Sequence, residues 1–129
     1  MLPVKLVFVD DDPDDRDLLI DSLSALGVDP FLVLDSGPSL FTYLESLNGQ
    51  NYPKAVVLDL NMPIMGGFEI LQKLKADNTY KRIQVYILTT AASESIKQKC
   101  LVEGAASYYI KPNSIVELNT ILNDIYDAT

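Results

Sequence analysis

Histidine is absent from this sequence, and its absence removes whole classes of chemistry. Histidine is the side chain best suited to general base catalysis at neutral pH and a frequent zinc ligand, so Ser-His-Asp triads and histidine-based metal sites are excluded. The single cysteine, Cys100, has no second cysteine in the chain with which to form a disulfide. Any chemistry of this protein must therefore use carboxylates, hydroxyls and amines.

Basic residues are scarce as well. Ten Lys and Arg stand against 18 Asp and Glu, which gives a formal net charge of -8. This charge repels nucleic acid and anionic lipid, so we expect neither nucleic acid nor a membrane as a partner. The sequence also lacks both the apolar run of roughly 20 residues that a membrane span needs and an apolar leader at its N-terminus. We therefore predict a cytoplasmic protein.

What the sequence does contain is a regular alternation of two patterns. Short apolar, β-branched runs alternate with longer segments in which apolar residues recur every three or four positions, which is typical of a parallel sheet covered by helices. The predicted strands are Val4–Val9, Phe31–Leu34, Ala55–Leu58, Ile83–Leu88 and Ala106–Ile110. The predicted helical faces contain Leu19, Leu23 and Leu26, then Leu40, Leu44 and Leu47, then Ile70, Leu71 and Leu74; two more helices span about Ser93–Glu103 and Ile115–Tyr126. We expect residues 1–129 to form a single α/β domain with no output domain.

Residues that commonly begin and end helices stand at the two ends of the first predicted helix. Asp12 is suited to cap its N-terminus, and Pro13 fits the first helical position because the missing N–H is not needed there. Gly27 follows the last apolar position and is suited to end the helix. The first predicted strand therefore leads directly into a capped helix.

Polar side chains follow four of the predicted strands at the point where each ends. They are Asp10, Asp11 and Asp12 after the first strand, Asp59 after the third, Thr89 and Thr90 after the fourth, and Lys111 with Pro112 after the fifth. In an open parallel sheet, ligands bind at the carboxyl ends of the strands. The sequence therefore predicts that acidic, hydroxyl and ammonium groups meet at one edge of the sheet.

Several carboxylates at neighbouring strand ends repel one another unless a cation lies among them. Mg²⁺ prefers oxygen ligands, and two carboxylates, a backbone carbonyl and a phosphate oxygen would suit it. The metal ion and Lys111 would then offset the charge of a phosphoryl group moving onto a carboxylate. Asp59 is the candidate acceptor.

Four segments together resemble the receiver domain of bacterial two-component response regulators. They are VDDDPDD at 9–15, VVLDLNMPIMGGFEIL at 56–71, YILTTA at 86–91 and GAASYYIKP at 104–112. The spacings of 30 residues from Asp59 to Thr89 and of 52 from Asp59 to Lys111 also match that family. The resemblance runs from about Lys5 to Tyr126. It implies a flavodoxin-like, doubly wound sheet of five parallel strands in the order 2-1-3-4-5 with five helices.

The resemblance also implies a role for each matching residue. Asp59 resembles the phosphorylated aspartate, Asp10 and Asp11 the acidic pair that holds Mg²⁺, and Asn61 the residue whose backbone carbonyl is a further metal ligand. Thr89 resembles the hydroxyl that binds the phosphoryl oxygen, Lys111 the ammonium that pairs with it, and Tyr108 the aromatic switch. Asp12 falls one place beyond the acidic pair and is expected to be a helix cap. The Lys111–Pro112 peptide bond is expected to be cis.

A protein of this kind is expected to accept a phosphoryl group from a sensor histidine kinase or a phosphotransfer protein, because this chain has no histidine of its own. Its signal would pass to a downstream protein by contact, through a shift between two surface arrangements. It would catalyse its own phosphorylation and slow dephosphorylation without being an enzyme that turns over a free substrate. We expect a monomer or weak dimer.

Two other interpretations remain open from the sequence. A phosphatase that resembles the haloacid dehalogenases would use an Asp-x-Asp pair after the first strand, which Asp10 and Asp12 could provide. That interpretation does not explain the Asp59, Asn61, Met62 and Pro63 motif. The chain could also be a docking module that works without phosphorylation, in which case Mg²⁺ binding would be absent or very weak.

Overall fold

The two central strands of the sheet, β1 (Leu6–Val9) and β3 (Ala55–Leu58), are apolar along their whole length because both of their faces are covered. In the computed structural model, which describes residues 3–129, every residue of β1 and β3 is buried. A parallel sheet between two helical layers requires strands of this kind. The remaining strands are β2 (Phe31–Leu34), β4 (Gln84–Thr89) and β5 (Ser107–Ile110).

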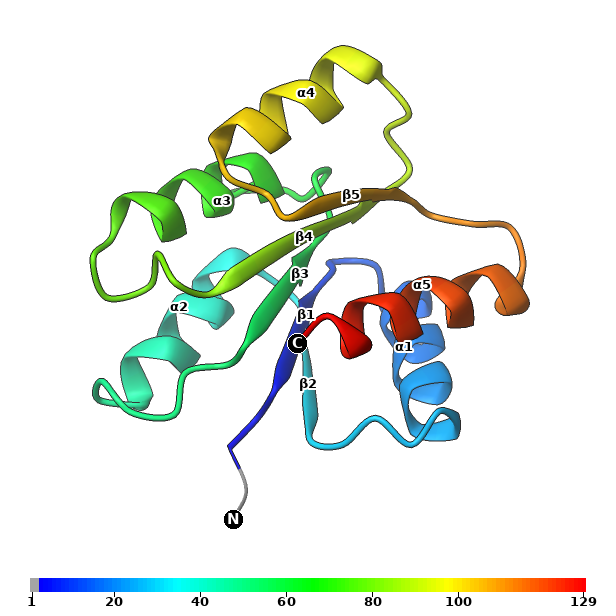
Figure 1. Ribbon diagram of the computed structural model, residues 1–129, viewed down its shortest axis with the longest axis horizontal. Coiled ribbons are helices and arrows are strands. Elements are labelled where there is room, and N and C mark those ends of the chain that lie inside the picture. Colours follow the sequence, from blue (N-terminus) through cyan, green and yellow to red (C-terminus); the bar gives the residue numbers. More distant parts are fainter. Residues whose placement is uncertain (1–2) are drawn as a thin grey trace.

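All the strands pair in parallel, in the order β2-β1-β3-β4-β5 (Figure 1). The predicted α/β fold and its strand order are therefore confirmed. In the central pair, Val9 lies opposite Leu58, so β1 and β3 end side by side. Four strand boundaries differ from the prediction: β1 and β5 begin later than expected, and β4 both begins and ends one residue later, at Gln84 and Thr89.

The helices lie in two layers, and Figure 1 shows α1 and α5 together on one side of the sheet. The chain order alternates strand and helix throughout, as the sequence pattern predicts. The bounds of the helices are Pro13–Ala25 for α1, Gly37–Ser46 for α2, Gly67–Ala76 for α3, Glu94–Glu103 for α4 and Ile115–Asp127 for α5. Among residues 3–129, no helix is both long and apolar enough to cross a membrane.

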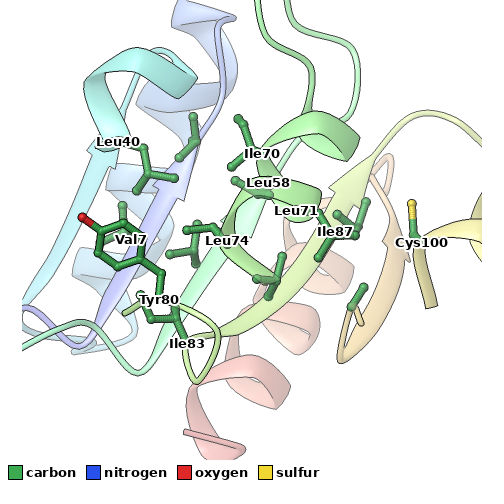
Figure 2. Close-up of a cluster of buried hydrophobic side chains, with 14 of the residues drawn as sticks. Val7, Leu40, Leu58, Ile70, Leu71, Leu74, Tyr80, Ile83, Ile87 and Cys100 are labelled. Atoms are coloured by element: carbon green, nitrogen blue, oxygen red, sulfur yellow. The ribbon is translucent and has the colours of Figure 1, made fainter. Parts of the chain in front are cut away.

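The layer formed by α2, α3 and α4 encloses the larger of two apolar clusters (Figure 2). Leu71 and Leu74 of α3 pack there against Leu58 of β3 and Ile87 of β4, and all four are fully buried. Cys100 of α4 is buried at the same cluster, as helix packing predicts. Alternate strand residues point to this layer, as the two-residue period of a strand requires.

The opposite layer is formed by α1 and α5 and encloses the second cluster. Phe8 of β1 lies at its centre, with Leu23 of α1 and Leu122 of α5 against it. In α1 the predicted Leu19 and Leu23 are buried. The apolar spacing of α5 predicts a buried face of Val116, Ile121, Leu122 and Ile125; Leu122 and Ile125 are buried, but Val116 is 76% exposed and Leu118 is buried instead. The sheet is thus covered on both faces, and its edge strands β2 and β5 are only partly buried.

The predicted signals at α1 are present in the structure. Asp12 is the N-cap, where its side chain accepts hydrogen bonds from the backbone N–H groups of Asp14 and Asp15. Pro13 stands in the first helical turn, and Gly27 lies just beyond the helix with a φ of 75°. Because the cap fixes where α1 begins, it also fixes the direction in which the helix leaves the carboxyl end of β1.

Candidate functional site

Asp10 and Asp59 lie next to each other because they follow the two central, neighbouring strands. Asp10 follows β1 and Asp59 follows β3, and the backbone N–H of Asp59 donates to the carbonyl oxygen of Val9 at 3.2 Å. Only 3% of Asp10 and 8% of Asp59 is exposed to solvent. We use the word rim for the loops at the carboxyl ends of β1, β3, β4 and β5 together with the first turn of α1.

Asp10, Asp11 and Asp59 form an acidic group that suits a hard divalent cation. One carboxylate oxygen from each lies within 4.8 Å of the others, close enough for all three to reach one ion. Carboxylate oxygens are ligands that Mg²⁺ prefers, and Mg²⁺ commonly keeps some of its waters. The donor set therefore fits the predicted Mg²⁺.

Lys111 brings the only ammonium group that contacts this acidic group among the described residues. Its Nζ lies 2.8 Å from Asp10 Oδ2, 3.0 Å from Asp59 Oδ2 and 2.7 Å from Asp15 Oδ2. Its side chain is 16% exposed, so solvent weakens these ion pairs less than it would on an open surface. The structure thus brings together the predicted acceptor, the acidic pair and the predicted lysine from three separate strands.

Burial and hydrogen bonding shift the pKa of Asp10 in opposite directions, and the same is true of the pKa of Lys111. Burial raises the pKa of Asp10, and the hydrogen bonds from Lys111 and from the backbone of Asp12 only partly offset it. Burial lowers the pKa of Lys111, but the hydrogen bonds to its three carboxylates outweigh this and raise the pKa above its usual value. Lys111 therefore stays charged throughout the physiological range.

Thr89 and Tyr108 lie behind the acidic group, on the α2–α3–α4 side of the sheet. Thr89 is fully buried at the end of β4, and its Oγ1 accepts a hydrogen bond from the backbone N–H of Ala91 at 3.3 Å. The Tyr108 hydroxyl donates to the carbonyl oxygen of Ala91 at 2.6 Å. Ala91 thus joins the two predicted switch residues. Within residues 3–129, no hydrogen bond joins Thr89 to Asp59 directly.

The two-residue period of a strand predicts that one of Tyr108 and Tyr109 faces inward and the other outward. The structure places them on opposite faces of the sheet, but helices cover both faces. Tyr108 is 8% exposed and packs in the larger cluster, whereas Tyr109 packs against the α1–α5 cluster. Tyr109 is not turned to open solvent, because α5 covers that face as well. Tyr108 is therefore the tyrosine on the same side as Thr89.

The loop between β3 and α3 is held tightly against Asp59. The backbone N–H of Asn61 donates to Asp59 Oδ1 at 3.3 Å. Gly67, the first residue of α3, approaches so closely that a Cβ there would lie 2.2 Å from the carbonyl oxygen of Asp59. Only glycine fits at this point, and the sequence signal for it, a glycine at a helix start, is too common to have identified it.

One expectation is wrong. The cis peptide bond of the described residues joins Asp29 to Pro30, and the Lys111–Pro112 bond is not cis. The trans form is the lower in energy for an X–Pro bond unless tertiary contacts select the cis form. Here Lys111 reaches all three carboxylates from a trans bond, so the ion pairs do not require cis.

Sequence reasoning missed two residues of the rim, and both come from the first turn of α1. Asp15 pairs with Lys111, and Arg16 donates from Nη1 to the carbonyl oxygen of Asp10 at 3.0 Å. A helix that begins at a strand end has its first turn at the same rim, so the sequence could have placed the first residues of α1 near the site. That signal applies equally to Asp14, which does not contact Lys111.

Comparison with known proteins agrees with the geometry. The family model for the response regulator receiver domain matches residues 6–123. Chemotaxis protein CheY1 of Helicobacter pylori strain J99 is 31% identical over 109 residues, which cover 84% of this chain and 86% of that protein. A chemotaxis protein CheY homolog of Campylobacter jejuni is 28% identical over 122 residues, covering 95% of this chain and 92% of its own length.

Solved structures show the same likeness. The Mn²⁺-bound form of response regulator Rcp1 aligns with a TM-score of 0.81 at 26% identity, covering 95% of this chain and 91% of that one. The phosphorylated cyanobacterial phytochrome response regulator RcpA aligns with a TM-score of 0.81 at 27% identity, with the same coverage.

Proposed function

The chain belongs to the family of response regulator receiver domains, and on this premise we propose that it accepts a phosphoryl group on Asp59 with Mg²⁺ bound. The observation that carries the proposal is the position of Asp59 Oδ2, which lies 3.0 Å from Lys111 Nζ and beside Asp10 and Asp11. The proposed donor is a sensor histidine kinase or a phosphotransfer protein, and the signal passes to a downstream protein by contact.

The proposed reaction is an in-line displacement at phosphorus. A carboxylate oxygen of Asp59 attacks the phosphoryl group of a phosphohistidine, and a new P–O bond forms. The P–N bond breaks, and its electron pair leaves with the imidazole of the donor. The product is an aspartyl phosphate on this chain and a free histidine on the partner. This is phosphoryl acceptance and not turnover of a free substrate.

The charges of the rim favour this step. Bound Mg²⁺, held by Asp10, Asp11, Asp59 and the proposed carbonyl of Asn61, would supply positive charge that offsets the phosphoryl oxygens. Lys111 supplies an ammonium whose Nζ lies 3.0 Å from Asp59 Oδ2. Because Lys111 is already in place, little reorganisation is needed when negative charge develops on the phosphoryl oxygens.

The proposed switch uses Thr89 and Tyr108. Phosphorylation adds about -1.5 to -2 charge and three acceptor oxygens at Asp59. The Thr89 hydroxyl would turn to donate to one of them and give up its hydrogen bond with Ala91. Ala91 also accepts the hydrogen bond from Tyr108, so a change at Thr89 passes to the loop between β4 and α4. The surface of α4 and β5 would change in consequence.

The phosphatase interpretation is less well supported. It needs Asp12 as a catalytic carboxylate, but Asp12 Oδ1 accepts hydrogen bonds from the backbone of Asp14 and Asp15 at 2.8 and 3.3 Å and caps α1. Repeated hydrolysis of a generic phosphate ester that survives Asp59→Asn and fails with Asp10→Asn would favour that interpretation.

The direct test is labelling by acetyl phosphate in the presence of Mg²⁺, followed by intact mass and acid or base lability. We expect wild-type protein and Asp14→Asn to gain one phosphoryl group and Asp59→Asn to gain none. Asp14 is the matched control because it is an exposed aspartate of the same rim. Full labelling of Asp59→Asn would overturn the acceptor assignment, and a wild type that does not bind Mg²⁺ would favour the docking module.

A further inference from the structure

We propose that Asp15 is the resting partner of Lys111: it holds one ammonium N–H while Asp59 is unphosphorylated and releases it when the phosphoryl group arrives. Asp15 is a positioning residue in this role, because it acts through Lys111. The inference rests on the proposed phosphorylation of Asp59, and it concerns a residue outside the acceptor, the acidic pair and the switch.

The number of N–H donors on Lys111 limits how many acceptors its ammonium can bind at once. A lysine ammonium has three N–H groups and no acceptor. Lys111 Nζ has three carboxylate partners, Asp10, Asp15 and Asp59, at 2.8, 2.7 and 3.0 Å. Every N–H of Lys111 is therefore in use, and a phosphoryl oxygen can receive one only if a present partner gives it up.

Burial decides which partner is released most easily. The side chains of Asp10 and Asp59 are 4% and 9% exposed, whereas that of Asp15 is 39% exposed. A carboxylate that loses its cation in a buried position carries a large desolvation cost, and one at the surface regains water. Asp15 is thus the partner whose ion pair with Lys111 breaks at the smallest cost.

The surroundings also leave room for the exchange. Asp15 and Lys111 both line a cavity of about 160 Å³ between α1 and α5, with apolar walls that include Leu18 and Ile115. Asp15 also borders the open acidic hollow that contains Asp11 and Asp59. Its side chain can therefore move from Lys111 into solvent without repacking of the core.

The same pairing assists the binding of Mg²⁺. An ion among Asp10, Asp11 and Asp59 repels the ammonium of Lys111 and weakens its ion pairs with Asp10 and Asp59. Asp15 keeps a third carboxylate beside Lys111 outside this acidic group, so the lysine remains paired. Removing the charge of Asp15 is expected to weaken Mg²⁺ binding and, once Mg²⁺ is saturating, to speed phosphorylation, because a competing anion is gone.

A structural role for Asp15 is the rival explanation, because acidic residues in a first helical turn stabilise the helix. Asp14 shares that position and that charge, and its backbone N–H binds the same Asp12 cap. Asp14 does not contact Lys111. A comparison of Asp15→Asn with Asp14→Asn therefore separates the two explanations, and Asp15→Glu tests rescue by a retained charge.

The experiment follows the Lys111 ammonium by NMR in protein labelled with ¹⁵N-lysine, with the signal assigned by Lys111→Arg. We expect Asp15→Asn to shift this signal and hasten its proton exchange, and Asp14→Asn to leave it unchanged. Adding Mg²⁺ and beryllofluoride, a phosphoryl mimic, should make the wild-type and Asp15→Asn signals coincide. Identical signals in all three resting proteins, or a difference that persists with beryllofluoride, would overturn the proposal.

Calorimetry and labelling supply the second measurement. We expect the Mg²⁺ dissociation constant to rise about threefold to tenfold in Asp15→Asn, by less than about twofold in Asp14→Asn, and to return toward the wild-type value in Asp15→Glu. With saturating Mg²⁺, acetyl phosphate should label Asp15→Asn about threefold faster than Asp14→Asn. Equal constants and rates in the two asparagine variants overturn the role of Asp15, whereas a wild type that is never labelled overturns the acceptor assignment instead.

Discussion

The middle of the sheet and its rim belong to the same strands but are built by opposite rules. In the middle, β1 and β3 carry only apolar side chains that are buried on both faces. One residue further along, the same two strands present Asp10 and Asp59, which are nearly as buried but charged. Burial of apolar groups stabilises the middle, whereas the charges of the rim are offset by Lys111 and, as proposed, by a bound cation.

The difference determines which property changes when a side-chain group is removed from each region. Removing an apolar group from the middle leaves a void, so the cost falls on the free energy of unfolding. Removing a charge from the rim relieves repulsion or breaks a pair, so the effect falls first on metal binding and phosphorylation. The two regions should therefore respond differently to the same kind of truncation.

The largest expected effect is in the middle. Leu71 is fully buried between α3 and the sheet, so Leu71→Ala should lower the free energy of unfolding by about 2–5 kcal/mol. Val102→Ala, at an 85% exposed position on α4, should change it by less than about 0.5 kcal/mol. Urea unfolding measures both. A Leu71→Ala variant as stable as Val102→Ala would show that the middle is not packed as described.

The second effect tests whether the rim acts independently. Mg²⁺ at 100 times its dissociation constant should stabilise the wild type by about 2.7 kcal/mol, because it binds the folded state. The increment should persist in Leu71→Ala and disappear in Asp11→Asn, which removes a proposed ligand of the ion. Thermal unfolding with and without Mg²⁺ gives the values. An increment that survives in Asp11→Asn would contradict the assigned ligands.

The third effect concerns strain at the rim. Ile64, in the loop between β3 and α3, has a φ of 70° and is 94% exposed. A β-branched residue in this left-handed region costs about 1–2 kcal/mol, whereas Asn tolerates it. Ile64→Asn should therefore raise the free energy of unfolding by about 1 kcal/mol. Val102→Asn also replaces an exposed apolar residue, but Val102 does not have a positive φ, so this variant should not raise the free energy of unfolding.

The smallest effect lies where the two regions meet, at Tyr108. Burial, followed by the nearby Cys100 and Asp59, raises the pKa of Tyr108, so the unfolded chain releases this proton first as pH rises. The folded state then holds more protons, and the stabilising contribution of Tyr108 is lost above about pH 10. The difference in stability between wild type and Tyr108→Phe should shrink from pH 9 to pH 11 in urea unfolding. A constant difference would contradict the shift.

Much of the fold was predictable because strand and helix periods are local properties of the chain. The positions of β2 and β3 match the prediction, since each is a short apolar run bounded by proline or charged residues. The start of β1 was less predictable. Val4 is as apolar as Leu6, but the charged Lys5 stands between them, and the pairing with β2 and β3 begins at Leu6.

The candidate site was predictable to the level of residue types at strand ends. Asp10, Asp59 and Lys111 could be expected at one rim, because parallel strands end on the same side of a sheet. The sequence could not distinguish Asp14 from Asp15, since both lie in the first turn of α1 and only the direction of each side chain decides which one reaches Lys111. It also suggested a cis bond before Pro112 that the structure does not have.

By itself, the sequence determined the alternation of strand and helix and the chemical groups that each strand carries at its end, because periodicity and residue identity are written along the chain. The tertiary structure alone decided that Lys111 is shared among three carboxylates, one of them 96 residues away on α1. It also decided that Gly67 lies against the backbone of Asp59. Such contacts depend on how two layers pack against the sheet, and no local pattern specifies that distance or direction.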